Sequence, residues 1–131
     1  NIIPAHVVMR EDVPHAKITD ADGNEVLLRF SQPNLAEWDG REILLGIRPE
    51  AMTDPEGADR QSANIQTLTN RVSVTEPAGS DTFVTMVLGG KEVVARMRAD
   101  ALVRPGQRFD FAANMEKAIA FDPKTEKRIA P

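Results

Sequence analysis

Hydrophobic and polar residues alternate along most of this chain in short segments, separated by residues that favour turns. A period of two residues is typical of β-strands, because their side chains point alternately to opposite faces. The segments with this pattern are Ala16–Thr19, Glu25–Phe30, Glu42–Ile47, Asn70–Glu76, Asp81–Leu88, Lys91–Met97, Arg108–Ala113 and Lys117–Phe121. Helical periodicity is poor, and one turn at Ala99–Leu102 is the only helix that we expect.

Turn residues predict how these segments connect. Asp20–Asn24 contains Asp-Gly and Gly-Asn, and Gly89-Gly90 joins a later pair of segments, so both are expected to form β-hairpins. Pro49 lacks a backbone N–H and favours an extended Arg48, so the preceding strand should end there. Residues 53–64 are polar and rich in breakers, which predicts a linker or a long surface loop.

Many short strands with Gly and Pro between them predict an all-β fold, a sandwich or barrel with little helix. The two halves also resemble each other. Gly23–Phe30 matches Gly90–Met97 at an offset of 67 positions, and Gly40–Leu45 matches Gly106–Phe111 at an offset of 66. We therefore interpret residues 1–131 as two related modules, about 1–55 and 65–131. Modules this small are marginal alone, so they should pack together or exchange strands. Chance similarity between Gly-punctuated strands is the alternative.

Composition and charge narrow the possible functions. The chain has no Cys, which excludes disulfides and thiolate metal sites. No apolar stretch approaches the roughly 18 residues of a membrane helix. Asn1–Pro4 has no signal-peptide character and no initiator Met, so we expect the N-terminus to be a cut. The net charge of −4 gives little attraction to nucleic acid phosphates, and the low aromatic content offers few stacking surfaces for bases.

No motif for catalysis, nucleotide binding or metal binding stands out. Walker and Gly-x-Gly-x-x-Gly sequences are missing, and His6 and His15 are the only histidines. No serine lies in a nucleophile-elbow context. The His6–His15 stretch does not have zinc-ligand spacing, and the acidic residues within 54–59 do not follow the calcium-loop pattern, so we expect a solvated loop there. We predict no catalytic, cofactor-binding or metal residues.

Several separated motifs resemble one protein family. Leu45–Glu50 is similar to the Leu-Gly-Ile-Arg-Pro-Glu sequence in the C-terminal regulatory region of ATP-binding subunits of bacterial ABC importers for maltose, glycerol phosphate and other sugars. Val74–Val84 resembles the Glu-x-Leu-Gly-Ser/Asn-Asp/Glu-Thr segment of that region, with Ala78 where Leu is usual. Ala120–Ile129 resembles its closing Leu-Phe-Asp-Pro-x-Thr-Gly-x-Arg-Ile, and Asn1–Ala5 resembles the Asn-Phe-Leu-Pro-Ala that follows the nucleotide-binding domain.

The resemblance implies OB-like barrel modules of the TOBE type and a role in regulation and dimerisation. It also implies an ATPase domain, with ATP and Mg, in a preceding part of the protein that this chain lacks. The implied partners are a second copy of the subunit, the membrane-spanning permease subunits and a cytoplasmic regulatory protein, with no nucleic acid. The implied location is the cytoplasmic face of the cell membrane.

The candidate interface or regulatory residues lie in three places: Arg48, Pro49 and Glu50; Gly79, Ser80 and Asp81; and Trp38. In extended chain Arg48 and Glu50 would face the same way and pair with each other or with a neighbour. Gly79–Asp81 is interpreted as a turn capped by its own side chains, or else an interface contact. Trp38 is either an exposed anchor or part of the core.

Two other functions stay open. Some TOBE relatives bind oxyanions such as molybdate, and Ser62-Ala63-Asn64 is similar to part of their Ser-Ala-Arg-Asn motif, without the Arg. A nucleic-acid-binding barrel is the third hypothesis. The transported solute is not encoded in this region, since other subunits select it in such importers.

Overall fold

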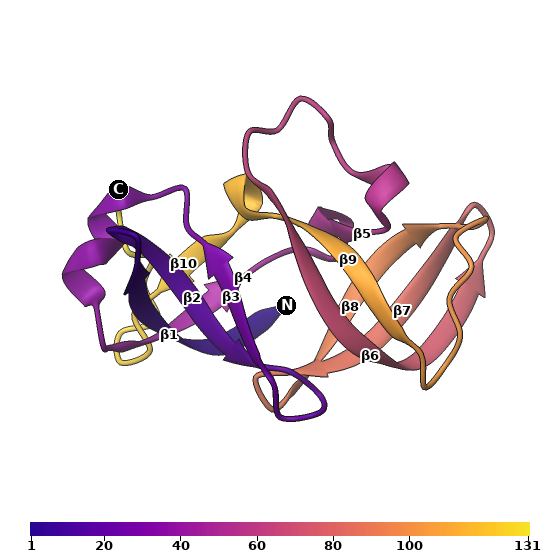
Figure 1. Ribbon diagram of the computed structural model, residues 1–131, viewed down its shortest axis with the longest axis horizontal. Coiled ribbons are helices and arrows are strands. Elements are labelled where there is room, and N and C mark those ends of the chain that lie inside the picture. Colours follow the sequence, from indigo (N-terminus) through magenta and orange to yellow (C-terminus); the bar gives the residue numbers. More distant parts are fainter.

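Strands and short 3-10 helices form all the regular structure in the computed structural model, which describes residues 1–131 (Figure 1). The strands are β1 (Ile2–Arg10), β2 (Val13–Thr19), β3 (Glu25–Arg29), β4 (Glu42–Gly46), β5 (Met52–Thr53), β6 (Ile65–Ala78), β7 (Asp81–Leu88), β8 (Lys91–Arg98), β9 (Arg108–Asn114) and β10 (Ile119–Phe121). The 3-10 helices are η1 (Pro33–Trp38), η2 (Pro49–Ala51), η3 (Pro55–Gly57) and η4 (Met115–Lys117). The all-β prediction is confirmed, and none of the helices has the length and apolar character needed to cross a membrane.

Two five-stranded sheets lie side by side, and they have equivalent strand orders (Figure 1). The first has the order β10-β4-β1-β2-β3 and the second β5-β9-β6-β7-β8. Strands β4, β1, β2 and β3 of the first sheet thus correspond to β9, β6, β7 and β8 of the second, and β10 corresponds to β5. The prediction of two related β modules packed together is confirmed by this repeated order, and we refer to the two units as the first and second repeat.

The repeats exchange their closing strands. β5 follows the first repeat but pairs with β9 of the second, with Met52 opposite Ala113. β10 follows the second repeat but pairs with β4 of the first, with Ile119 opposite Gly46. The polar segment 53–64 thus begins inside a strand rather than as a linker, and each sheet is complete only when the other half of the chain is folded.

Side-chain amides add to this coupling at the edges of the sheets. Asn1 accepts from the Val94 backbone N–H at 2.9 Å and donates to the carbonyl of the same residue at 2.7 Å. Gln66 of the second repeat makes the corresponding pair of bonds with Arg29 on β3, at 2.7 and 2.8 Å. Each amide thus satisfies the backbone of an edge strand in the other repeat, where unpaired groups would otherwise remain.

Gly89 shows how closely the repeats approach. It adopts φ +62° in the β7–β8 turn, and its N–H donates to the Thr19 carbonyl at 2.8 Å. A Cβ at this position would lie 2.8 Å from the carbonyl oxygen of Pro4. A side chain at Gly89 would therefore push the repeats apart as well as strain the backbone.

One hydrophobic core of 27 buried residues spans both repeats. Alternate residues of the strands supply it: Ile3, Ala5 and Val7 of β1 are buried, and so are Val93 and Met97 of β8, where the sequence pattern predicts the alternation. Because the core is continuous, a packing defect in one repeat should also lower the stability of the other.

The structure also differs from the sequence-based elements in a few places. β1 and η1 were not predicted, and the expected helical turn at Ala99–Leu102 is wrong, since only a non-helical turn forms there. β6 begins at Ile65 and runs through Pro77. Its pairing with β9 ends at Arg71, so Pro77 has a strand on one side only, and its missing N–H removes no ladder bond there.

We expect Leu68→Ala to lower the free energy of unfolding by about 2–4 kcal/mol, because Leu68 is buried in β6. Trp38, the sole tryptophan, lies in the first repeat, whereas Leu68 lies in the second. Urea unfolding followed by Trp38 fluorescence should shift by the same amount as unfolding followed by circular dichroism. The exposed neighbour Thr67→Ala is the control and should change stability by less than about 0.5 kcal/mol. An unchanged Trp38 transition would contradict the coupling.

Candidate interaction site

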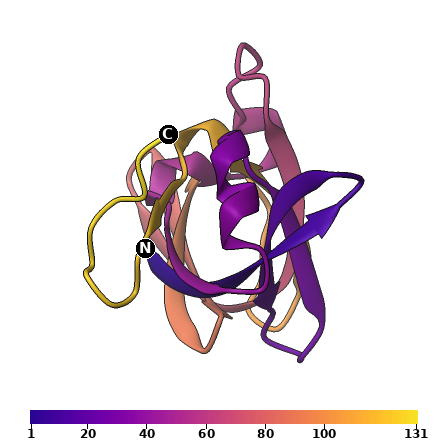
Figure 2. The same ribbon diagram turned by 90° about the vertical axis from the view of Figure 1, so that its left-hand side faces the viewer.

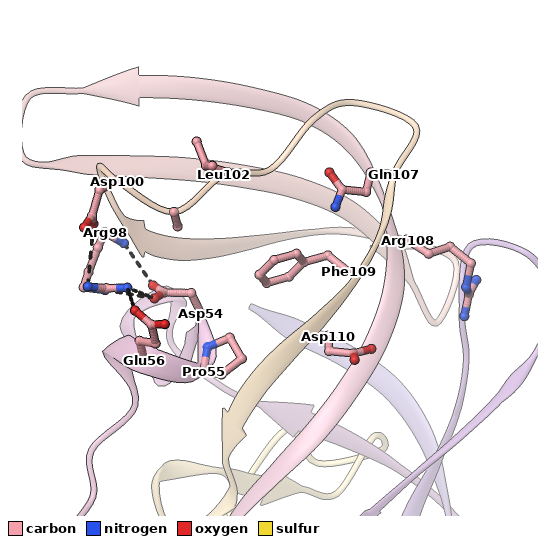
Figure 3. A pocket seen from close by; sticks show the side chains of 11 residues that line it. Asp54, Pro55, Glu56, Arg98, Asp100, Leu102, Gln107, Arg108, Phe109 and Asp110 are labelled. Atoms are coloured by element: carbon pink, nitrogen blue, oxygen red, sulfur yellow. Dashed lines mark hydrogen bonds and ion pairs between the residues drawn. The ribbon is translucent and has the colours of Figure 1, made fainter.

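An open groove of about 570 Å³ lies on the second repeat, where the end of β8, the following loop and β9 face η3. Figure 3 shows the side chains around it. Only three of its 11 lining residues are hydrophobic. Such a lining suits a charged or polar partner better than a small apolar ligand.

Arg98, the last residue of β8, holds the acidic side chains of this groove together (Figure 3). Its guanidinium lies 2.7 Å from an Asp54 carboxylate oxygen, 3.1 Å from Glu56 and 3.6 Å from Asp100. Asp54 also accepts hydrogen bonds from the backbone N–H groups of Arg98 and Gly57. These bonds fix η3 against the end of β8 and form one wall of the groove.

Asp54 is buried, and its environment determines its charge. Burial alone would raise the pKa of Asp54, but the Arg98 guanidinium and the Arg98 backbone N–H hold this pKa below its ordinary value. The same contact raises the pKa of Arg98. The pair therefore stays ionised at neutral pH, and the prediction of a solvated acidic loop is wrong for Asp54.

A second charged cluster joins the two repeats. Asp20 and Asp22, in the β2–β3 turn, bind Arg108 of β9, and Asp22 also binds Arg71 of β6 at 3.0 Å. Burial would raise the pKa of Asp20, but the backbone N–H groups of Asn24 and Asp22, together with Arg108, lower it. Hydrogen bonds from Arg71 and Arg108 lower the pKa of Asp22. The cluster fixes a hairpin of the first repeat against two strands of the second.

The predicted residues Arg48, Pro49 and Glu50 lie at η2, just before β5. Arg48 and Glu50 are exposed, and neither takes part in an ion pair. The expected pairing of Arg48 and Glu50 is therefore wrong. The reason is local, since Pro49 starts a 3-10 turn and the chain is not extended through Glu50.

Gly79 and Ser80 form the tight turn between β6 and β7, and Gly79 has φ +68°. The turn prediction is confirmed. Asp81 does not cap the turn but forms an ion pair with Arg96 of the neighbouring β8 at 2.9 Å. The two predicted segments, at η2 and at this turn, do not belong to the groove around Arg98.

Trp38 ends η1 and packs, partly buried, against the core. The Arg41 guanidinium lies 3.8 Å from the centre of its ring, a cation–π contact. The core-packing alternative is therefore confirmed for Trp38, and its role as an interface anchor stays a prediction.

The segment Ser62–Asn64 was the basis of the oxyanion hypothesis. The Ser62 hydroxyl donates to Glu116 at 2.9 Å, and the Ala63 N–H donates to the same carboxylate at 2.9 Å. The Asn64 side chain donates to Ser31 and to the Arg29 carbonyl. The donors of this segment are therefore already bound to groups of the chain itself.

The groove residues Asp54 and Arg98 were not predicted as a site. They are 44 positions apart in the sequence, and only the exchange of β5 into the second sheet brings them together. One signal was present, because Asp54 directly precedes Pro55 and so occupies an N-cap position.

Comparison with protein families gives one match. The model of the TOBE domain family matches residues 45–121. This range runs from β4 through β10 and so includes both exchanged strands.

Curated relatives match between about two thirds and nearly all of this chain. It is 32% identical over 127 residues to the sulfoquinovosyl glycerol transport ATP-binding protein SmoE of Agrobacterium fabrum, covering 96% of this chain and 34% of the relative. It is 36% identical to the sn-glycerol-3-phosphate import ATP-binding protein UgpC of Chromobacterium violaceum, and this match covers 82% of the chain and 27% of the relative. The chain is 33% identical to the trehalose/maltose import ATP-binding protein MalK of Thermococcus litoralis, and this match covers 69% of the chain and 24% of the relative. The chain thus spans about a third or less of each relative.

One solved structure with a similar fold is the cytoplasmic molybdate-binding protein ModG, with molybdate bound. The TM-score is 0.56 at 18% sequence identity, covering 92% of this chain and 94% of that one. At this identity the likeness concerns the fold alone.

Replacing Asp54 tests the charged wall of the groove. We expect Asp54→Asn to lower the free energy of unfolding at pH 7 by about 1–3 kcal/mol, because it leaves Arg98 without its buried partner. Asp39→Asn changes an exposed carboxylate and should have an effect below about 0.5 kcal/mol. Urea denaturation measures both, and equal stabilities of the two variants would contradict the assigned role.

The lowered pKa of Asp54 also predicts a pH dependence. A carboxyl with a folded-state pKa below its unfolded value stabilises the protein above the unfolded pKa, and this stabilisation is lost as the pH falls through the folded pKa. The stability difference between the parent chain and Asp54→Asn should therefore shrink from about pH 5 downwards. Urea titrations at several pH values measure it, and a constant difference would show that Asp54 titrates normally.

Proposed function

Because the chain belongs to the TOBE domain family, we propose that it is the C-terminal regulatory and dimerisation domain of the ATP-binding subunit of a bacterial ABC importer for sugars or related solutes. The observation that carries this proposal is the match to SmoE, which extends over 96% of this chain but only 34% of the relative. UgpC and MalK, which are named as import ATP-binding proteins, match in the same partial way.

In this proposal ATP binding and hydrolysis belong to another part of the parent subunit, together with Mg. The chain itself contains no Walker sequence. Its contribution is a rigid body with several separate surfaces. The exchanged strands and the Asp20–Arg108 cluster hold the two repeats in one arrangement, so partners bound to different repeats would be kept at a fixed separation.

The proposed partners are a second copy of the subunit, the membrane-spanning permease subunits through the parent chain, and a cytoplasmic regulatory protein. The proposed location is the cytoplasmic face of the cell membrane. A binding role is supported by three exposed residues whose side chains make no ion pair or hydrogen bond within the chain: Arg48, Glu50 and Ser80. Exposed charges such as those of Arg48 and Glu50 set partner choice and association rate more than affinity.

Oxyanion binding is a second candidate, motivated by Ser62-Ala63-Asn64. The geometry disfavours it, because the Glu116 carboxylate accepts the hydrogen bonds that an oxyanion would need from Ser62 and Ala63. An approaching anion would also be repelled by this carboxylate.

Calorimetric titration of the chain with molybdate, sulfate and phosphate is expected to give no heat of binding. The variant Glu116→Gln, which removes the carboxylate charge that competes with an oxyanion, should be titrated in parallel. Saturable heat from the unmodified chain would favour oxyanion binding over the regulatory proposal.

Deleting this region from the parent subunit tests the regulatory and dimerisation proposal. We expect the deletion to weaken dimerisation in light scattering and to remove regulation of transport. Reversing the charges of Arg48 and Glu50 should reproduce part of the loss if η2 contacts a partner, whereas reversal of Glu11 and Asp12 in the β1–β2 turn serves as the control. Unchanged dimers and unchanged regulation after the deletion would refute the proposal.

A further inference from the structure

The internal repeat allows the equivalent ends of the two sheets to be compared. We call them the first barrel end, at η1, and the second barrel end, at the groove. In the first repeat the loop after β3 contains η1, with Leu35 in it. In the second repeat the loop after β8 contains Leu102 at the equivalent place, 67 positions later, which is the offset of the neighbouring Gly23 and Gly90. If the two repeats were equivalent in every respect, each of these loops would cover the end of its own repeat.

The first barrel end is closed. Leu35 is only 1% exposed, and Ile43 of β4 beneath this end is fully buried. η1 lies across this end of the molecule, facing the viewer in Figure 2. The C-terminal tail completes the cover, since Gln32 donates to the Ile129 carbonyl at 3.0 Å and Asn34 donates to the Ala130 carbonyl at 2.7 Å.

The second barrel end is open. Leu102 is 90% exposed, and its side chain points away from Phe109 in Figure 3. Phe109 takes the place of Ile43, at an offset of 66, yet it is only half-buried and lines the groove. The chain that follows β5 forms η3 at one wall of the groove and then continues into β6, whereas the C-terminal tail lies over the first end. The groove thus has a half-buried aromatic floor at Phe109 and an exposed aliphatic lip at Leu102.

The charges around this floor indicate what would fit. Four carboxylates and two guanidinium groups line the groove. Arg108 is already bound to Asp20 and Asp22, outside the groove. The side chains of Glu56 and Asp100 are 80% and 78% exposed, so they remain accessible although both contact Arg98. The groove therefore favours a positively charged occupant.

We propose that this groove binds an extended segment of a partner protein that presents an aliphatic side chain beside Lys or Arg. The aliphatic group packs on Phe109, and the basic groups meet Glu56 and Asp100. The chain supplies a template for such a segment, since Lys127-Arg128-Ile129 of its own tail buries Ile129 at the first barrel end. The inference goes beyond the proposed function, because it rests on the two barrel ends and not on the parent protein.

A labelled peptide with the sequence of residues 122–131 is the probe, titrated into the complete chain and followed by fluorescence anisotropy and amide chemical shifts. Binding should perturb the amides of Leu102 and Phe109 and weaken with added salt. The double variant Glu56→Gln/Asp100→Asn should weaken binding about five-fold. The matched control Glu11→Gln/Asp12→Asn removes the same charge from a distant turn and should change it less than about two-fold.

Three results would overturn the proposal. The first is equal affinity of the two double variants for the peptide. The second is a perturbation confined to Leu35 and Gln32, which would mean that the peptide only displaces the chain's own tail. The third is no binding at about 1 mM peptide while Leu102 becomes protected as the protein concentration rises, which would make a second copy of the chain the occupant. Each result leaves the deletion experiment on the parent subunit unaffected.

Discussion

The exchange of β5 and β10 between the repeats is the constraint on which the rest of the structure depends. Each sheet borrows its last strand from the other half of the chain, so neither repeat buries its core without the other. A unit of about 60 residues is marginal by itself, and the exchange merges two such units into one core of 27 residues. The paired amides of Asn1 and Gln66 and the close contact at Gly89 follow from this arrangement.

The charged clusters depend on the same exchange. Asp54 directly follows β5, and because β5 lies in the second sheet, Asp54 reaches Arg98 at the end of β8. Asp20 and Asp22 reach Arg108 across the junction of the repeats. Each cluster pairs one buried carboxylate, Asp54 or Asp20, with a partly exposed arginine, which keeps the charges hydrated on one side and limits the desolvation penalty. The result is a body that presents fixed surfaces, as the proposed regulatory role requires.

Much of this fold could be predicted from the sequence. The hairpins at Asp20–Asn24 and Gly89–Gly90 follow from local turn chemistry, and the offset between Gly23 and Gly90 revealed the repeat. β1 was missed, although Ile3, Ala5 and Val7 alternate in it. The groove could not be predicted, because Asp54 and Arg98 meet only through a long-range strand exchange. The open end of the second repeat was equally hidden, since Leu35 and Leu102 are the same residue type at equivalent positions, yet one is buried in η1 and the other is exposed in a loop.

Native-state hydrogen exchange tests most directly the claim that the two repeats form one body. The account predicts that the slowest amides of β1 and β2 open with the same free energy as those of β6 and β7, and that both values equal the free energy of global unfolding. It predicts the same for the amides that pair β10 with β4 and β5 with β9. If the amides of one sheet opened at a free energy several kcal/mol below those of the other, the repeats would be independent modules and the account would be contradicted.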